Sequence, residues 1–176
     1  MMEKEIQFIK TLKGESDKLD QFYCEVKHKG KLIGTSNGFL IHRSCRDEEV
    51  FDIASYFQCK TKRDSVSVLS LLEMTIIEKY RGNGIGKRFF DWMLKEFQTD
   101  GIIMQPICIC DKSEQSIRGE DLVLFYEKIL QKNNYKIGMM TGSVFNYMTG
   151  TKIEQTIIRN PLKGEKGGQD RRVESI

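Results

Sequence analysis

The chain is poor in the residues that build metal sites, and it has no long apolar run. Its 176 residues include only two histidines, and its five cysteines are scattered along the sequence. Because a structural zinc site takes about four Cys, His or carboxylate ligands, we expect no metal. No apolar run reaches about 18 residues, and the N-terminal sequence MMEKEIQFIK does not have the pattern of a secretory signal. We therefore expect no membrane span.

The cysteines and the charge balance are those of an ordinary intracellular domain. Cys108 and Cys110 would point the same way on a strand, and we interpret them as buried thiols rather than as metal ligands. An odd cysteine count without an export signal favours reduced thiols, so we predict a cytoplasmic location. The 28 Lys and Arg nearly balance the 25 Asp and Glu, and the net charge of +3 argues against a nucleic-acid partner.

The most informative stretch, 69–97, predicts a strand, a glycine turn and an amphipathic helix. Residues 70–77 are rich in apolar and β-branched residues, which is typical of a strand covered on both faces. Glycine then occupies every second position from Gly82 to Gly86 and permits a sharp turn with exposed N–H groups. The apolar residues that recur every four positions after this turn are Ile85, Phe89, Met93 and Phe97.

The glycine turn is a candidate anion site, because unpaired N–H groups and the helix dipole both point at it. Two common phosphate motifs fail on spacing. Lys87 stands where a dinucleotide fingerprint needs glycine, and Arg88 stands where a Walker loop needs Ser or Thr. The run Arg81-Gly82-Asn83-Gly84-Ile85-Gly86 instead resembles the acetyl-CoA pyrophosphate loop of the GNAT superfamily of N-acetyltransferases. The segment Phe125-Tyr126-Glu127-Lys128 strengthens this resemblance.

The resemblance implies an α/β (α+β) fold with a mixed, mostly antiparallel central sheet, flanked by helices. In this family the fourth and fifth strands splay apart, and the acyl thioester lies in the gap. The run from Gly30 to Gly34 resembles the hairpin between the second and third strands of the family. We expect one domain over residues 1–162 and a polar tail over 163–176 that lacks apolar periodicity.

The chain departs from the family before its second strand. Most members have two helices there, whereas this sequence leaves room only for a short polar loop over 14–20. Apolar spacing predicts a helix over 47–57 instead, and we infer that this helix supplies the missing wall of the acceptor cleft. Its acidic residues either attract a cationic amine or form a solvated face that complements the helix dipole. These residues are Asp47, Glu48, Glu49 and Asp52.

The other elements follow from apolar patterns. Strands are predicted over 3–12, 22–29, 32–41 and 101–110, and a further helix over 120–132. Pro106 cannot donate a ladder hydrogen bond and indicates a bulge or an edge in the fifth strand. Asn133 and Asn134 are candidate C-terminal caps of the last helix. A C-terminal hairpin turns either at Thr141-Gly142 or at Thr149-Gly150.

Two residues are candidates for acid and base chemistry. Tyr126 matches the family tyrosine beside the thioester sulfur, where a phenol donates a hydrogen bond to the leaving thiolate; the alternative is a packed core tyrosine. Glu73 is a carboxylate on an apolar strand, on the same face as Thr75. Burial would raise the pKa of Glu73 toward that of a useful general base. Alternatively, Glu73 contacts solvent or a cation. Gly119 stands where the family usually has an asparagine, which weakens the expected pantetheine contacts.

The resemblance also implies the residues that hold the co-substrate acetyl-CoA. The backbone of Thr75, Ile76 and Ile77 would pair with the pantetheine amides, and the Ile76 N–H would face the thioester oxygen. The pyrophosphate would lie in the loop formed by Arg81, Gly82, Asn83, Gly84, Ile85, Gly86 and Lys87. Arg88 fits a solvated helix position equally well.

The sequence therefore predicts an N-acetyltransferase that moves an acetyl group from acetyl-CoA to a primary amine by direct transfer. The acceptor is a small molecule or a peptide, and the enzyme is a monomer or a homodimer without a nucleic-acid or membrane partner. The alternative is a non-catalytic acyl-CoA-binding regulatory module on the same fold, which the absence of the asparagine at Gly119 favours.

Overall fold

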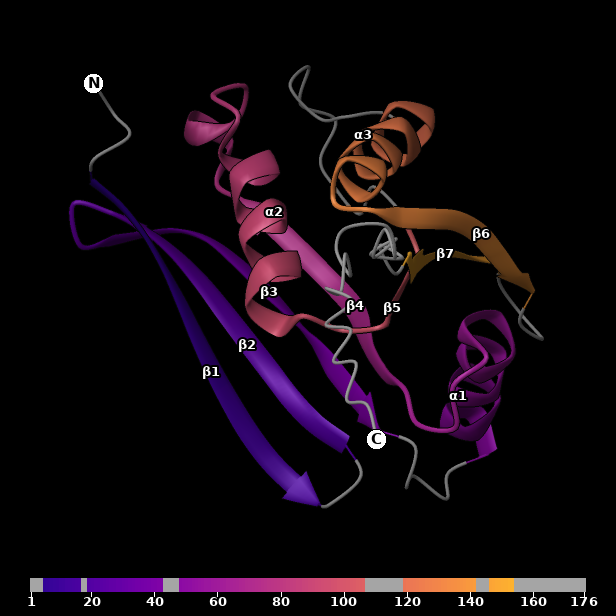
Figure 1. Cartoon of the computed structure of the whole chain (residues 1–176). Coiled ribbons are helices and arrows are strands. Elements are labelled where there is room, and N and C mark those ends of the chain that lie inside the picture. Colours follow the sequence, from indigo (N-terminus) through magenta and orange to yellow (C-terminus); the bar gives the residue numbers. More distant parts are fainter. Residues whose placement is uncertain (1–4, 17–18, 43–47, 107–118, 142–145, 154–176) are drawn as a thin grey trace, which may run out of the picture.

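A computed structural model describes residues 5–16, 19–42, 48–106, 119–141 and 146–153 (Figure 1). The strands are β1 (Ile6–Ser16), β2 (Leu19–His28), β3 (Lys31–His42), β4 (Ser67–Ile76), β5 (Gly101–Met104), β6 (Tyr135–Thr141) and β7 (Asn146–Lys152). The α-helices are α1 (Glu48–Thr61), α2 (Ile85–Phe97) and α3 (Gly119–Lys132), and a short 3-10 helix, η2 (Glu78–Tyr80), precedes α2. No helix in the described residues is long and apolar enough to cross a membrane.

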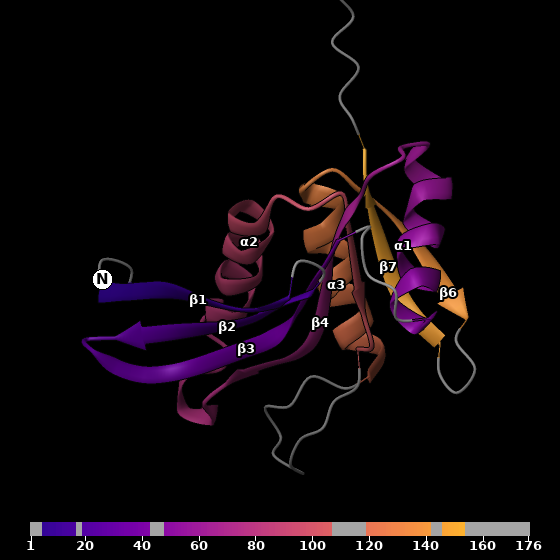
Figure 2. The same cartoon turned by 90° about the horizontal axis from the view of Figure 1, so that it is seen from below.

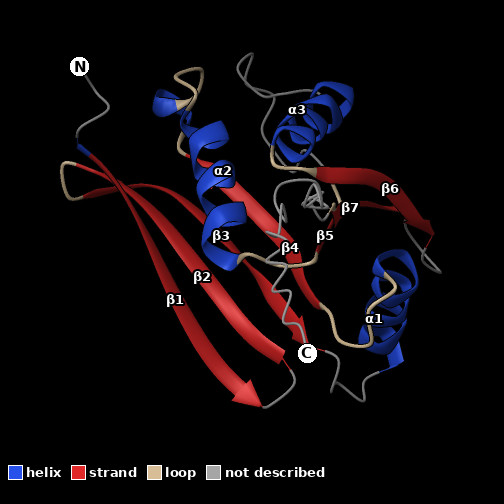
Figure 3. Cartoon of the chain, in the orientation of Figure 1, coloured by secondary structure: helices blue, strands red, loops and turns tan. Residues whose placement is uncertain are grey.

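The strands form one seven-stranded sheet in the order β1-β2-β3-β4-β5-β7-β6 (Figure 3). Every neighbouring pair is antiparallel except β4 and β5, which are parallel. A parallel pair needs a crossover connection, and α2 provides it. The predicted mixed, mostly antiparallel sheet flanked by helices is confirmed.

The sheet splays open between β4 and β5. Pairing joins only Val68–Leu71 to Gly101–Met104, whereas β4 continues to Ile76. Among the described residues, the second half of β4 thus has a partner only on its β3 side. Pro106 follows the end of β5 by two residues and cannot extend the ladder as a donor. The predicted gap between the fourth and fifth strands is confirmed, while residues 107–110 of the predicted fifth strand lie outside the described residues.

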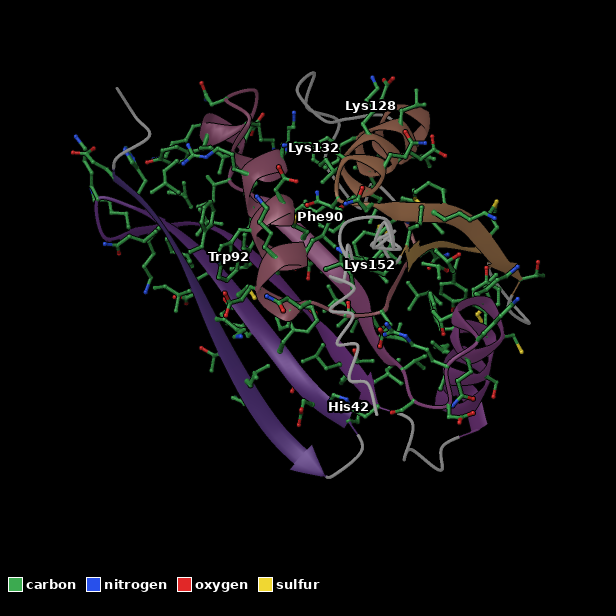
Figure 4. All side chains as sticks on the ribbon, viewed as in Figure 1. His42, Phe90, Trp92, Lys128, Lys132 and Lys152 are labelled. Atoms are coloured by element: carbon green, nitrogen blue, oxygen red, sulfur yellow. The ribbon has the colours of Figure 1, made fainter. Side chains whose placement is uncertain are left out.

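The helices lie on opposite faces of the sheet (Figure 1 and Figure 2). α2 and α3 cover one face, and their side chains Phe89, Phe90 and Leu130 belong to the main core with Leu69 of β4. α1 covers the other face, where it forms a smaller core with residues of β3, β4 and β5. In Figure 4 Trp92 and Phe90 leave α2 in different directions.

These two aromatic residues join α2 to different parts of the fold. Trp92 stacks on Phe8 of β1 at 5.4 Å between ring centroids. Phe90 makes an edge contact with Tyr126 of α3 at 4.9 Å. Aromatic pairs at such separations stabilise packing by about 0.5–1.5 kcal/mol. One helix therefore fixes both the N-terminal strand and α3 against the sheet.

The described structure corrects several predicted boundaries. The short polar loop predicted over 14–20 has the wrong bounds, because β1 continues to Ser16 and β2 begins at Leu19, with a register shift between Gly14 and Ser16. β6 ends at Thr141 and pairs with β7, which begins at Asn146. The hairpin connection therefore follows Thr141, as one of the two alternatives expected, and it lies outside the described residues. The alternative at Thr149-Gly150 is wrong, since both residues pair with β5 and β6.

The predicted helix cap after α3 is confirmed. Asn134 has a positive φ of 62°, and the Asn133 side-chain amide donates to the carbonyl oxygen of Ile129 at 2.8 Å. Asparagine tolerates this left-handed conformation and satisfies a terminal carbonyl. The predicted tail and both Cys108 and Cys110 lie outside the described residues.

Candidate functional site

The glycine turn forms an open N-terminus on α2. Gly82 and Gly84 have positive φ angles of 78° and 71°, which glycine adopts without steric cost. Gly84 is the N-cap of α2; no side chain of a described residue caps it, and the first turn has no acidic residue. A Cβ added at Gly82 or Gly84 would meet no atom within 4 Å. The unshielded N–H groups and the space in front of them fit an anion such as a pyrophosphate.

Side chains of the loop itself hold it to the end of β4. The Arg81 guanidinium donates from Nε to the carbonyl oxygen of Ile76 at 2.8 Å. The Asn83 amide donates to the carbonyl oxygen of Arg81 at 3.1 Å. The backbone N–H of Arg81 also closes η2 on the carbonyl of Glu78 at 2.9 Å. The loop thus has an internal hydrogen-bond framework before any ligand binds.

Gly86 brings the loop, β4 and α3 together. A Cβ at Gly86 would lie 3.8 Å from Ile76 Cγ1 and 4.0 Å from Phe125 Cζ. The first turn of α2 therefore packs closely on the last residue of β4 and on the residue before Tyr126. This contact connects two segments that the sequence resemblance named separately, the loop and the Phe125-Tyr126 pair.

The backbone groups at the end of β4, which are predicted to contact pantetheine, differ in whether they already have hydrogen-bond partners. The Ile77 N–H donates to the carbonyl of Ile33 at 2.9 Å, and the Ile77 carbonyl accepts from the N–H of Tyr80 at 2.9 Å. Both backbone groups of Ile77 therefore already have a hydrogen-bond partner within the fold, while the contact of Ile77 with pantetheine stays a prediction. Backbone groups alternate in direction along a strand, so Thr75 also points toward β3.

The residues of β4 whose backbone groups point toward the gap are Ile76 and Met74, which alternate with Thr75 and Ile77. Ile76 alternates with Thr75 and Ile77, so its N–H faces the side where β5 has ended. Met74 points the same way by the same alternation. Sequence reasoning missed Met74, because the direction of a backbone group is set by the pairing with β3 and not by the side chain.

A β-bulge in β4 decides which side chains face the open side of the sheet. Asn37 pairs with Glu73 and Gly38 with Leu71, so Leu72 is an extra residue in β4. Leu69 and Leu71 belong to the main core before the bulge, and Ile76 belongs to it after the bulge. One extra residue changes the parity of the strand. Glu73 and Thr75 therefore lie on the face away from α2 and α3.

Glu73 is held by neighbouring polar side chains on that face. Its Oε2 accepts from the Asn37 amide at 3.3 Å, and its Oε1 accepts from the Thr75 hydroxyl at 3.1 Å. Its side chain is exposed, as are those of Leu72 and Thr75. Of the two alternatives left open for Glu73, contact with solvent is therefore the correct one, and β4 is covered on both faces only before the bulge.

Tyr126 lies on the opposite face, within the main core. It is 6% exposed and packs edge-on against Phe90 and Phe125 at centroid distances of 4.9 and 5.2 Å. Burial raises the pKa of the Tyr126 hydroxyl to about 12, because the charged phenolate loses its hydration. The hydroxyl therefore remains protonated, and in the described part of the chain it has no hydrogen-bond partner.

α1 packs against the C-terminal hairpin and the start of the central strand. Its Tyr56 hydroxyl lies 3.1 Å from Thr149 Oγ1 and donates to the carbonyl of Met139 at 3.4 Å. The acidic residues at the start of α1 lie outside the described side chains. Among the described residues, no group of three or more His, Cys, Asp or Glu could hold a metal ion.

No protein-family model and no curated protein matches the sequence of this chain. Several solved structures are similar. NAA60 of Arabidopsis thaliana in complex with acetyl-CoA is 14% identical, covers 76% of each chain and has a TM-score of 0.45. The diaminobutyrate acetyltransferase EctA of Paenibacillus lautus, with its substrate and coenzyme A, is 14% identical over 73% of this chain and 69% of that one, at a TM-score of 0.41.

FeeM, an N-acyl amino acid synthase from uncultured soil microbes, is 6% identical over 84% of this chain and 91% of that one, with a TM-score of 0.45. The features that the sequence resemblance implied are present in the chain itself. They are the mixed, mostly antiparallel sheet, the gap after Leu71 and the glycine loop at the start of the following helix. By these features the chain has the fold of the GNAT superfamily of N-acetyltransferases.

Proposed function

We propose that the protein is an acetyl-CoA-dependent N-acetyltransferase that transfers the acetyl group directly to a primary amine. The observation that carries this proposal is the gap beside the second half of β4, which ends at an open helix N-terminus. The arrangement offers a backbone edge for an extended amide chain and, next to it, a site for phosphate groups.

Acetyl-CoA supplies the activated acyl group, and the chain supplies the groups that hold it. The backbone N–H of Ile76 and the groups of Met74 face the gap and would pair with amides of the pantetheine arm. The pyrophosphate would lie against the loop from Arg81 to Lys87. Its negative charges complement the dipole of α2 and the two cationic side chains at the ends of this loop.

Amine acetylation requires a free amine, an attack on the thioester carbonyl and a proton for the leaving thiolate. The new C–N bond forms as the C–S bond breaks, and the sulfur leaves with the electron pair. Glu73 would take the amine proton on the open face of the sheet. Tyr126 would donate to the sulfur from the other face. The Tyr126 hydroxyl suits this role because it remains protonated well above neutral pH.

The first experiment separates binding from catalysis. Acetyl-CoA at a hundredfold excess over its dissociation constant should stabilise the protein by about 2.7 kcal/mol, seen as a higher melting temperature. Release of CoA should then be followed with a peptide carrying a free N-terminus, L-2,4-diaminobutyrate and agmatine as acceptors.

The outcomes distinguish the candidate functions. Stabilisation together with amine-dependent CoA release supports the acetyltransferase. Stabilisation without release with any acceptor favours the acyl-CoA-binding module. No stabilisation and no calorimetric heat of binding would contradict the cofactor assignment itself.

A further inference from the structure

Asn37 is the one residue of β3 whose side chain contacts the Glu73 carboxylate among the described residues. Its amide donates to Oε2 at 3.3 Å, while the Thr75 hydroxyl donates to Oε1 at 3.1 Å. Each carboxylate oxygen therefore has one donor, and the two donors come from different strands. An ionised carboxylate accepts about four hydrogen bonds, so lone pairs remain on both oxygens for a further donor.

The backbone around Glu73 is held from the same strand. Asn37 and Glu73 are paired directly in the ladder, and the hydroxyl of the fully buried Ser36 donates to the carbonyl oxygen of Glu73 at 2.8 Å. The bulge at Leu72 directly precedes this point. Because bulges re-aim a side chain, the contacts from β3 fix both the main chain and the carboxylate of Glu73 in the re-aimed position.

The donors that hold Glu73 are neutral. No ion pair of Glu73 occurs within the described part of the chain, where its two hydrogen-bond donors are the Asn37 amide and the Thr75 hydroxyl. A lysine or arginine in place of Asn37 would orient the carboxylate but would also neutralise it, and would stabilise its ionised form against accepting a proton. An amide orients the group and leaves its charge available to an ammonium or an amine.

We propose that Asn37 is a positioning residue, which holds the Glu73 carboxylate in the orientation that receives the amine proton. This inference rests on the proposed acetyl transfer. In the reaction the amine N–H bond breaks as the proton passes to a Glu73 oxygen, and the nitrogen lone pair forms the bond to the acetyl carbon. Asn37 contacts neither reactant and acts only through Glu73.

A double-mutant cycle tests this role. The variants are Asn37→Leu, which is close in volume and lacks the donor, Glu73→Gln, and the combination of the two. The readout is kcat and KM for CoA release, with the amine of the acceptor panel that the wild-type protein acetylates. Loss of a hydrogen bond to a charged group should lower kcat in Asn37→Leu by roughly ten- to a hundredfold, with the KM for acetyl-CoA changed by less than about threefold.

The combined variant gives the decisive comparison. If Asn37 acts through Glu73, adding Asn37→Leu to Glu73→Gln should lower kcat by less than about threefold further. Asn37→Gln, which keeps an amide donor on a longer side chain, should recover part of the loss. Thr35→Val is the matched control, because Thr35 lies on the same face of β3 and makes no hydrogen bond to Glu73 in the described structure; it should keep wild-type kcat.

Several results would overturn the proposal. Additive losses in the combined variant would show that Asn37 acts elsewhere, and wild-type kcat in a folded Asn37→Leu protein would show that it does not act at all. If Asn37→Leu does not fold, Asn37→Asp gives the same decision, since a like charge beside Glu73 should lower kcat only when Glu73 is present. Wild-type turnover in Glu73→Gln would remove this role but leave acetyl transfer intact. If the protein binds acetyl-CoA but no amine of the panel increases CoA release, both the role of Asn37 and the proposed acetyl transfer would be contradicted.

Discussion

The Arg81 guanidinium is hydrogen-bonded through Nε to the carbonyl oxygen of Ile76, the last residue of β4, at 2.8 Å. This bond joins the two parts of the site that would hold acetyl-CoA, the strand edge and the phosphate loop. A guanidinium has five donors in a fixed fork, so one residue can fix the loop and still present charge toward an anion. Arg81 therefore holds the loop to the end of β4 through the geometry of its guanidinium, and not through its charge alone.

Replacing Arg81 should separate these two tasks. Arg81→Lys keeps the charge but has no Nε in the fork geometry, and we expect acetyl-CoA affinity to fall at least tenfold, which corresponds to about 1.4 kcal/mol. Calorimetry on Arg81→Lys and Arg81→Met measures the loss. Lys79→Met is the control, since it removes a nearby exposed charge that lies over the ring of the adjacent Tyr80, 5.1 Å from its centroid. Wild-type affinity in Arg81→Lys would show that the bond to Ile76 is dispensable.

A matched pair at Gly84 tests the anion site. Asn and Asp both tolerate the left-handed conformation of this residue, and the space in front of it is open. Gly84→Asp should abolish acetyl-CoA binding, because its carboxylate would occupy the position of the pyrophosphate and repel it. Gly84→Asn fills the same space without the negative charge, so it should lose clearly less affinity than Gly84→Asp. Equal affinity in the two variants, both shown to be folded by circular dichroism, would mean that no anion lies at this turn.

Tyr126→Phe tests the proposed acid. The ring keeps its contacts with Phe90 and Phe125, so the fold should survive the loss of the hydroxyl. We expect kcat to fall by roughly ten- to ten-thousandfold, the range for one acid or hydrogen-bond donor. The KM for acetyl-CoA should change much less, because the bond to sulfur strengthens in the transition state. Unchanged kcat with chemistry rate-limiting would make Tyr126 a core residue only.

The raised pKa of Tyr126 also predicts a loss of stability in alkali. The pKa is about 12 in the folded protein and 10.0 as the reference value, so between these values the unfolded chain releases its proton first. The stabilising contribution is complete below pH 10 and is lost as the pH rises toward 12, at about 1.4 kcal/mol per pKa unit.

Urea unfolding at pH 9 and pH 11 measures this effect. Tyr126→Phe should lose less free energy of unfolding between the two pH values than the wild-type protein does. Tyr23→Phe is the control, because Tyr23 is exposed on β2 and its removal should leave the pH dependence as it is. The same pH dependence in all three proteins would argue against a buried, protonated Tyr126.

Gly38 should be required for the bulge in β4. It lies opposite Leu71 where the register shifts, and a Cβ there would overlap the carbonyl oxygen of Ser70 and lie 2.8 Å from the Phe22 ring. We expect Gly38→Ala to destabilise the protein by about 1–3 kcal/mol. Gly14→Ala is the control, because its Cβ would lie at an ordinary 3.5 Å from Asp20 and its effect should be neutral or stabilising. Equal urea midpoints for the two variants would contradict the close packing at Gly38.

The sequence by itself determined the local features of this protein. Apolar spacing after Gly84 predicted the helix that runs from Ile85 to Phe97, and the asparagines at 133 and 134 predicted where α3 ends. The glycine loop was visible because its chemistry depends on consecutive residues. Such features depend on hydrogen bonds and torsion angles within a few positions of one another, which a sequence pattern records.

Tertiary structure decided the placement of the reactive side chains. The bulge at Leu72 exists only in the pairing of β4 with β3. It moves Glu73 onto an exposed face and so decides between burial and contact with solvent, which the sequence left open. The contact between Asn37 and Glu73 joins residues 36 positions apart, a separation at which neither residue type nor spacing specifies a partner. Successive side chains of a strand point to opposite faces, so a single extra residue changes the face on which every later side chain lies. Only the assembled sheet shows where that residue is.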